Sequence, residues 1–128
     1  MAAELTAPQQ AADVLLVEHR LEHLHRLVGA AQIDNVAVID AGRLHRIDGH
    51  RSVKAHISHV LKVSPEEAGR RAKLARALRE LPDIAAALRA GQISLCHVQV
   101  VARVQANPRI KEKVPGQQEK FLRLAAEE

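Results

Sequence analysis

Residues 52–79 read SVKAHISHVLKVSPEEAGRRAKLARALR, and the rest of the chain is interpreted around them. Ser52 is suited to cap a first helix, because a serine oxygen can accept a hydrogen bond from a free backbone N–H. Ser64, Pro65 and Glu67 have the spacing of a capping box with proline at the first helical position, which predicts a second helix. A short helix, a tight turn and a longer basic helix form the outline of a helix-turn-helix, whose second helix lies in a DNA groove.

Both predicted helices are amphipathic. The apolar face of the first is expected to consist of Val53, Ile57, Val60 and Leu61. The second is expected to bury a stripe of Leu74, Ala75 and Leu78. At about 100° per residue, Lys73, Arg76 and Arg79 fall on its other side. Gly69 lies within this helix and costs about 1 kcal/mol relative to alanine.

Positive charge is concentrated in the same stretch. Residues 1–50 hold four Lys/Arg against seven Asp/Glu, residues 51–79 hold eight against two, and residues 80–128 hold seven against six. Such a patch favours a polyanion, and the predicted partner is double-stranded DNA. The residues predicted to contact it are Arg51, Lys54, Lys62, Arg70, Arg71, Lys73, Arg76 and Arg79. Phe121 is the only aromatic residue, which argues against a single-strand binder that stacks bases on rings.

The N-terminal part, residues 8–47, is expected to be largely helical. A heptad seam, with spacings of 3, 4, 3, 4 and 3, is formed by Val14, Val17, Leu21, Leu24, Val28 and Ala31. Gly29 either bends this helix or lies within it. The seam is either part of the core, which is its more common use in a small domain, or the interface of a homodimer.

The C-terminal part, residues 82–126, is expected to form shorter helices. Helix starts are predicted at Pro82, at Ser94, at Asn107-Pro108 and shortly after Pro115-Gly116. Gly91 is expected to end the first of these helices. Alanine and leucine favour helices, and the aromatic residues that favour strands are nearly absent. The predicted fold is all-α, a compact multi-helix domain over residues 1–128 with a long N-terminal helix and a central helix-turn-helix.

Other features limit the function classes. Cys96 is the only cysteine, so no internal disulfide is expected, and Cys96 is predicted to be a small buried side chain. Neighbouring helix residues point about 100° apart, so Cys96 and His97 are not a nucleophile and its base. The N-terminus lacks a secretory signal pattern, and no apolar run reaches the roughly 18 residues of a membrane span. A cytoplasmic protein without membrane contact is expected.

The histidines suggest metal chemistry only weakly. His19, Glu22 and His23 spell H-x-x-E-H, the inverted zinc-peptidase motif. A third ligand and a catalytic cleft are not evident, so this motif is interpreted as a solvated helix face. The helical pair His56 and His59 is interpreted in the same way. No metal, cofactor, catalytic residue or intrinsic enzyme activity is expected.

Several short motifs occur in a characteristic order. They are Asp48-Gly49-His50-Arg51-Ser52, Val63-Ser64-Pro65-Glu66-Glu67-Ala68, Leu74-Ala75-Arg76-Ala77-Leu78, Leu81-Pro82 and Ala90-Gly91-Gln92-Ile93-Ser94. Together they resemble the actinobacterial 13E12-repeat family over nearly the whole chain. This resemblance implies a domain of unknown function that usually lies N-terminal to an HNH endonuclease. The metal-ligating residues of such a nuclease are not found in this sequence, so nuclease activity is not carried over.

A shorter resemblance runs from about Ala55 to Val104. It is carried by Leu81-Pro82, by Ala87-Leu88-Arg89-Ala90-Gly91-Gln92-Ile93-Ser94 and by His97. These residues are similar to the DNA-binding core of plasmid-partition ParB-type proteins, which implies a helix-turn-helix followed by a short helix, a turn and a further helix. The sequence therefore predicts a DNA-binding module, the targeting part of a 13E12-repeat protein. The alternative is a helical interaction or oligomerisation module without nucleic-acid binding.

Overall fold

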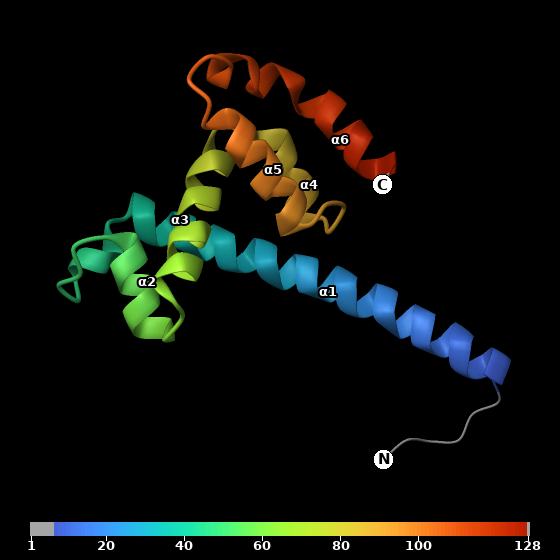
Figure 1. Ribbon diagram of the computed structural model, residues 1–128. Helices are drawn as coiled ribbons and strands as arrows, with labels where there is room; N and C mark the ends of the chain where they lie inside the picture. Colours follow the sequence, from blue (N-terminus) through green and yellow to red (C-terminus); the bar gives the residue numbers. More distant parts are fainter. Residues whose placement is uncertain (1–6, 128) are drawn as a thin grey trace.

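The computed structural model describes the backbone of residues 7–127, and side chains from residue 10 (Figure 1). The described part contains helices and no strand, as the predicted all-α fold requires. The α-helices are α1 (Ala7–Ala41), α2 (Val53–Leu61), α3 (Pro65–Arg79), α4 (Pro82–Arg89), α5 (Leu95–Gln105) and α6 (Gln118–Glu127). Short 3-10 helices lie at η1 (Leu44–Arg46), η2 (Lys111–Lys113) and η3 (Pro115–Gln117).

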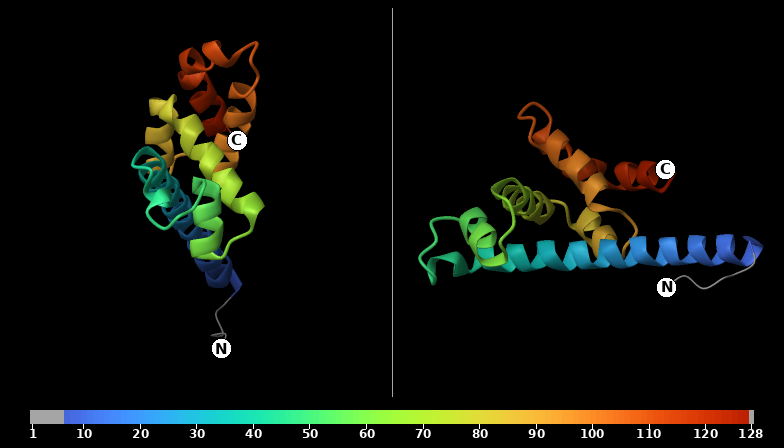
Figure 2. Two further views of the ribbon diagram at one scale, coloured as in Figure 1. Left: turned by 90° about the vertical axis from the view of Figure 1, so that its left-hand side faces the viewer. Right: turned by 60° about the horizontal axis from the view of Figure 1, so that its bottom comes forward.

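Helix α1 is 35 residues long, which corresponds to roughly 52 Å. Helices α2 to α5 pack along its C-terminal half, with α6 packed on α4, and the N-terminal end of α1 extends away from them (Figures 1 and 2). Ala30, Ile33 and Val36, the core residues that α1 contributes, all lie in the C-terminal half. We call the helices packed there, α2 to α6, the helical body.

Gly29 lies inside α1, so the helix runs through it without interruption. A Cβ on Gly29 would lie 2.9 Å from Cδ1 of Leu95, so the missing side chain lets α5 approach α1 closely. Of residues 8–47, which are predicted to be largely helical, α1 covers the part up to Ala41 and η1 covers Leu44–Arg46. Leu44 and Ile47 are exposed beyond that end instead of continuing the apolar stripe.

Helix α3 is the centre of the helical body and packs against α1, α2, α4 and α5. Its predicted buried stripe is confirmed, since Leu74, Ala75 and Leu78 are buried. The largest fully buried side chains of the described chain are Ile33, Ile57, Leu74, Leu81, Ile84, Leu88 and Val98, which come from α1 to α5 and the link before α4. A recognition helix of a helix-turn-helix is usually exposed along one side, and here neighbours cover most of α3.

The predicted helix starts at Ser52 and Ser64 are confirmed. The Ala55 N–H donates to Ser52 Oγ at 3.0 Å, and the Glu67 N–H donates to Ser64 Oγ at 3.1 Å. The reciprocal half of the predicted capping box is wrong, because the carboxylate of Glu67 accepts hydrogen bonds from Arg70 and Arg71 instead. These charged donors form stronger hydrogen bonds than a backbone N–H.

The turn between α2 and α3 consists of Lys62, Val63 and Ser64. Lys62 adopts a left-handed conformation with φ of 55°, where glycine is the more usual residue. The hydroxyl of Ser58 donates to the Val63 carbonyl at 2.9 Å and fastens the turn to α2. The predicted apolar face of α2 is only half correct, because Val60 and Leu61 are exposed near this turn.

The link between α4 and α5 docks the helical body onto α1. Gly91 has φ of +75°, and a Cβ there would lie 2.5 Å from a ring carbon of His23 on α1. Arg26 donates to the carbonyls of Gly91 and Gln92 at 3.3 Å each. Glycine is therefore required at this position both for its backbone conformation and for the space above it.

The C-terminal helices differ from the prediction in detail. No helix begins at Pro108, because Oδ1 of Asn107 accepts from the Arg109 N–H in a local turn. Helix α6 follows Pro115-Gly116 as expected, and its buried Gln118 accepts from the N–H groups of Asp83 and Ile84. Gln118 thus caps the start of α4, although it lies 34 residues after Ile84 in the sequence.

One predicted core assignment is wrong, and one of the two alternatives for the heptad seam is excluded. Cys96 is exposed near the start of α5. The heptad seam is exposed as well, with Leu21 at 60% and Leu24 at 56%. The helical body meets α1 on a different face and only along its C-terminal half, so the seam is not part of the monomer core.

None of the helices in the described part of the chain combines the length and apolarity that crossing a bilayer requires.

Candidate nucleic-acid interface

The eight cations predicted to contact DNA fall into two groups. Four of them are engaged in ion pairs, namely Arg70, Arg71, Arg76 and Arg79. The other four, Arg51, Lys54, Lys62 and Lys73, are exposed. Within residues 10–127, none of these four forms an ion pair. They are therefore the more available contacts for an anionic partner.

Glu67 holds two of the paired arginines. Its carboxylate accepts from Arg70 Nη2 at 2.6 Å and from Arg71 Nε at 2.9 Å. Hydrogen bonds from Arg70, aided by one from Arg71 and opposed by desolvation, lower the pKa of Glu67 to about 2. The same pair raises the pKa of Arg70. Arg71 and Glu67 are therefore mainly structural, and a phosphate would have to compete for Arg70.

Asp40 on α1 holds the other two paired arginines. Its Oδ2 lies 3.0 Å from Arg79 Nη2 and 3.6 Å from Arg76 Nε. One turn and a half earlier on α1, Asp34 binds Arg89 of α4 through two hydrogen bonds of 2.9 and 3.0 Å, which raises the pKa of Arg89. These pairs fasten α3 and α4 to α1, although Arg76 and Arg79 keep more than half of their side-chain surface exposed.

A groove of about 660 Å³ runs between α3 and α5. Five of its lining residues are cationic: Arg70, Lys73, Arg76, Arg103 and Lys111. We call this surface the basic groove. Its one lining carboxylate, Glu80, accepts a 2.8 Å hydrogen bond from the buried Gln105. The groove is therefore a concentrated positive surface built from three separate segments of the chain.

Arg103 and Lys111 were not predicted as contacts. They lie on α5 and η2, and nothing in their local sequence indicates that these segments pack beside α3. Conversely, Arg51 and Lys62 lie at opposite ends of α2, outside the groove lining. The concentration of charge in the sequence therefore predicted correctly that α3 is basic. It did not predict that Arg103 and Lys111 lie across the groove from α3.

Lys54 extends the positive surface from α2 toward α3. A Cβ on Gly69 would lie 3.5 Å from Cδ and Cε of Lys54, so the aliphatic stem of this lysine lies over the glycine. A Cβ on Gly69 would make only ordinary contact with this stem, so the packing does not require glycine there. The exposed Glu66 on α3 and Glu80 directly after it reduce the positive charge of this helix, so the neighbouring segments also contribute to the positive excess.

Comparison with family models provides one match. The model described as "Domain of unknown function (DUF222)" matches residues 16–118. The chain belongs to the DUF222 family. The matched range contains most of α1 and the whole of the basic groove, and it is consistent with the 13E12-repeat resemblance seen in the motifs. No curated protein and no solved structure matches this DUF222 chain.

The H-x-x-E-H motif lies on α1 of the DUF222 domain. His19 and His23 are exposed, as the interpretation of a solvated face predicts. Glu22 forms an ion pair with Arg26 at 3.1 Å, and the ring of His23 lies against Gly91. The motif therefore belongs to the contact between α1 and the helical body.

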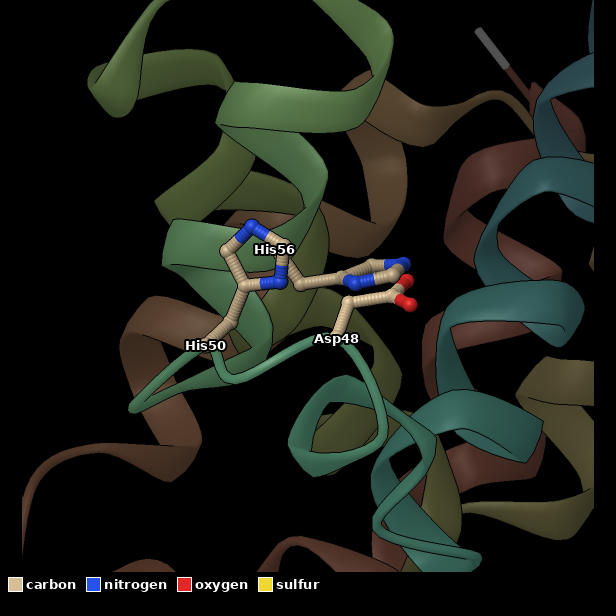
Figure 3. Close-up of side chains that lie close together, drawn as sticks. All are labelled: Asp48, His50 and His56. Carbon is tan, nitrogen blue, oxygen red and sulfur yellow. The ribbon is translucent and has the colours of Figure 1, made fainter.

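A different histidine cluster lies in the loop between η1 and α2 and on α2 itself. Asp48, His50 and His56 each offer a ligand atom, and the three atoms lie within 4.8 Å of one another (Figure 3). The solvated-face interpretation holds for His59, which is exposed, and is wrong for His56, which is half-buried. Among the residues described with side chains, no other group of three such ligands was found.

Proposed function

We propose that this DUF222 domain binds double-stranded DNA through the basic groove. The observation that supports the proposal is the convergence of Arg70, Lys73, Arg76, Arg103 and Lys111 on one surface. Lysine and arginine side chains grip phosphates, and arginine can also hydrogen-bond a guanine edge. The proposal assigns a binding role and no reaction.

The order of elements adds support. Helices α2 and α3 are followed by α4, by the turn from Gly91 to Ser94 and by α5, as in the ParB-type core that the sequence resembles. In our proposal the open face of α3, with Lys73 and Arg76, approaches the duplex. Lys54 contacts the DNA phosphate backbone from the side of α2, and Arg103 and Lys111 contact it from the side of α5 and η2.

The test is a titration of a labelled duplex at several salt concentrations. If about five phosphates are neutralised, the logarithm of the affinity falls with the logarithm of salt at a slope of about −4 to −5. Selection from a random pool of duplexes then reports whether any sequence is preferred. Absence of binding, or a flat salt response, would rule out the proposal.

A pair of triple variants locates the interface. Lys73→Ala, Arg103→Ala and Lys111→Ala together remove three exposed groove cations that form no ion pair within residues 10–127. We expect weaker binding and a salt slope shallower by about 3.

The matched control removes the same charge elsewhere, through Arg20→Ala, Lys120→Ala and Arg123→Ala, all exposed on α1 and α6. The control is expected to keep most of the affinity. Equal loss in the two triple variants would mean that net charge, and not the groove, determines binding.

The exposed heptad seam favours a second candidate function, self-association of α1 with a second copy of the chain. At about 100° per residue, Val14 through Val28 lie between about 100° and 180° around α1 from Ile33, which points into the core. The seam is therefore turned away from the helical body, and a second α1 can approach it without displacing any helix. Apolar residues at heptad spacing suit pairing with an identical helix.

Light scattering tests self-association. Leu21→Glu with Leu24→Glu places two charges on the seam at exposed positions, so the monomer fold is preserved. A dimeric wild type and a monomeric double variant are expected. The control, Ile47→Glu with Leu124→Glu, changes two exposed apolar residues outside the seam. A folded wild type that stays monomeric at high concentration would exclude this second function.

A further inference from the structure

We infer that Asp48, His50 and His56 form a binding site for a divalent transition-metal ion of the zinc class. Asp48 and His50 lie in the loop between η1 and α2, and His56 lies on α2 (Figure 3). The inference is independent of DNA binding and of self-association.

The geometry is close to that of a metal site. One ligand atom from each residue lies within 4.8 Å of the other two, whereas ligand atoms around tetrahedral zinc stand roughly 3.4 Å apart, given bonds of about 2.0–2.1 Å. Small side-chain rotations bring the three atoms to that spacing. The rings of His50 and His56 have centroids 5.1 Å apart and an interplanar angle of 88°, so their nitrogen lone pairs can point to one centre without ring stacking.

The histidines have unused ligand atoms. The Nδ1 atoms of His50 and His56 are buried and have no hydrogen-bond partner. A buried polar atom without a partner is unfavourable, because it no longer forms a hydrogen bond to water and no protein group replaces that bond. The carboxylate of Asp48 likewise forms no hydrogen bond or ion pair with the residues described from Gln10 to Glu127. A bound cation would satisfy all three groups together.

The donor set indicates which metal fits. Two imidazoles and one carboxylate are ligands typical of zinc and its neighbours, whereas magnesium and calcium prefer oxygen alone. Three protein ligands leave a fourth position for water. His59 packs edgewise against His50 at 5.2 Å and limits the rotation of that ring, which favours a fixed ligand orientation.

A metal at this position would fasten the loop to α2. The loop is already closed by the His50 N–H, which donates to the His45 carbonyl at 3.0 Å. Arg51 and the helix cap Ser52 directly follow His50. The metal would therefore stabilise the segment that leads into α2.

The test uses the full chain, stripped with a chelator and titrated with Zn²⁺ by calorimetry, with bound metal measured after gel filtration. We expect one zinc per chain, a higher Tm with zinc, and Co²⁺ absorption bands typical of four-coordinate nitrogen and oxygen ligands. Absence of zinc uptake, or an octahedral Co²⁺ spectrum, would contradict the inference.

Variants assign the ligands. His50→Ala and His56→Ala should each weaken zinc binding by more than about tenfold, since loss of an outer partner alone costs about 10–100-fold. Asp48→Asn changes an exposed side chain, so it tests the site without risk to the fold. The matched control, His19→Ala with His23→Ala, removes the other histidine pair and should leave the affinity unchanged. Zinc binding that survives in His56→Ala, or that is lost only in the control, would overturn the assignment.

Discussion

The two halves of α1 have apolar side chains at helical spacing, yet they have opposite surroundings. In the C-terminal half, Ile33 is 1% exposed beneath the helical body. In the N-terminal half, Leu21 is 60% exposed, and the seam around it faces solvent. Periodicity therefore specifies that a helix has an apolar face, but the partner of that face depends on where the rest of the chain packs.

The largest expected effect compares the two halves directly. Ile33→Ala removes a fully buried side chain and should lower the free energy of unfolding by about 2–5 kcal/mol. Leu21→Ala should change it by less than about 0.5 kcal/mol. Urea unfolding at two protein concentrations measures both. A loss for Leu21→Ala that grows with protein concentration would instead indicate that a second copy covers the seam.

A second prediction concerns the boundary between the halves, where the helical body docks onto α1. Gly91→Ala forces a Cβ against the His23 ring at a positive φ, and we expect a loss of about 1–3 kcal/mol. Gly116→Ala is the control, because a Cβ there has nothing within 4 Å. Equal thermal stability of the two variants would contradict both the clash with His23 and the strain of the positive φ.

A third prediction uses acid to probe α3, which packs on the C-terminal half. The pKa of Glu67 is lowered from 4.5 to about 2 in the folded chain. Its stabilising contribution is therefore fully present above pH 4.5 and is lost as the pH falls toward 2. Because the pair is partly exposed and screened, that contribution is about 1 kcal/mol.

The measurement is urea unfolding of the wild type and Glu67→Gln across this pH range. The wild type should be the more stable protein at neutral pH, and the two curves should converge in acid. A stability difference that stays constant down to pH 2 would mean that the ion pair with Arg70 is not the cause.

The smallest expected effect separates the charged residues of the two halves. Asp40→Asn weakens the pairs with Arg76 and Arg79 and should cost about 0.2–1 kcal/mol. Asp13→Asn, in the exposed half, should cost nothing measurable. If DNA binds the basic groove, Asp40→Asn should also tighten binding, because Arg76 is released. Weaker binding of Asp40→Asn in the titration of the labelled duplex would contradict this.

Local signals in the sequence predicted most of the helix starts and ends. Ser52, Ser64 and Gly91 act within a few residues of their own positions, so their hydrogen bonds and backbone conformations can be inferred from the sequence. The capping box at Ser64 failed in one detail, because Glu67 had two charged donors in reach on the next turn. The same local logic missed Asn107-Pro108, where a side chain–backbone turn replaced the expected helix.

The sequence by itself determined the all-α class, most helix starts and the basic character of α3, because each depends on neighbours within about one helical turn. Only the tertiary structure decided which face of α1 is buried, that Gln118 caps α4, and that Arg103 and Lys111 lie beside α3. It also brought Asp48, His50 and His56 together and left the Nδ1 atoms of the two histidines without hydrogen-bond partners. These features depend on contacts between distant segments, and such contacts follow from the packing of the whole core.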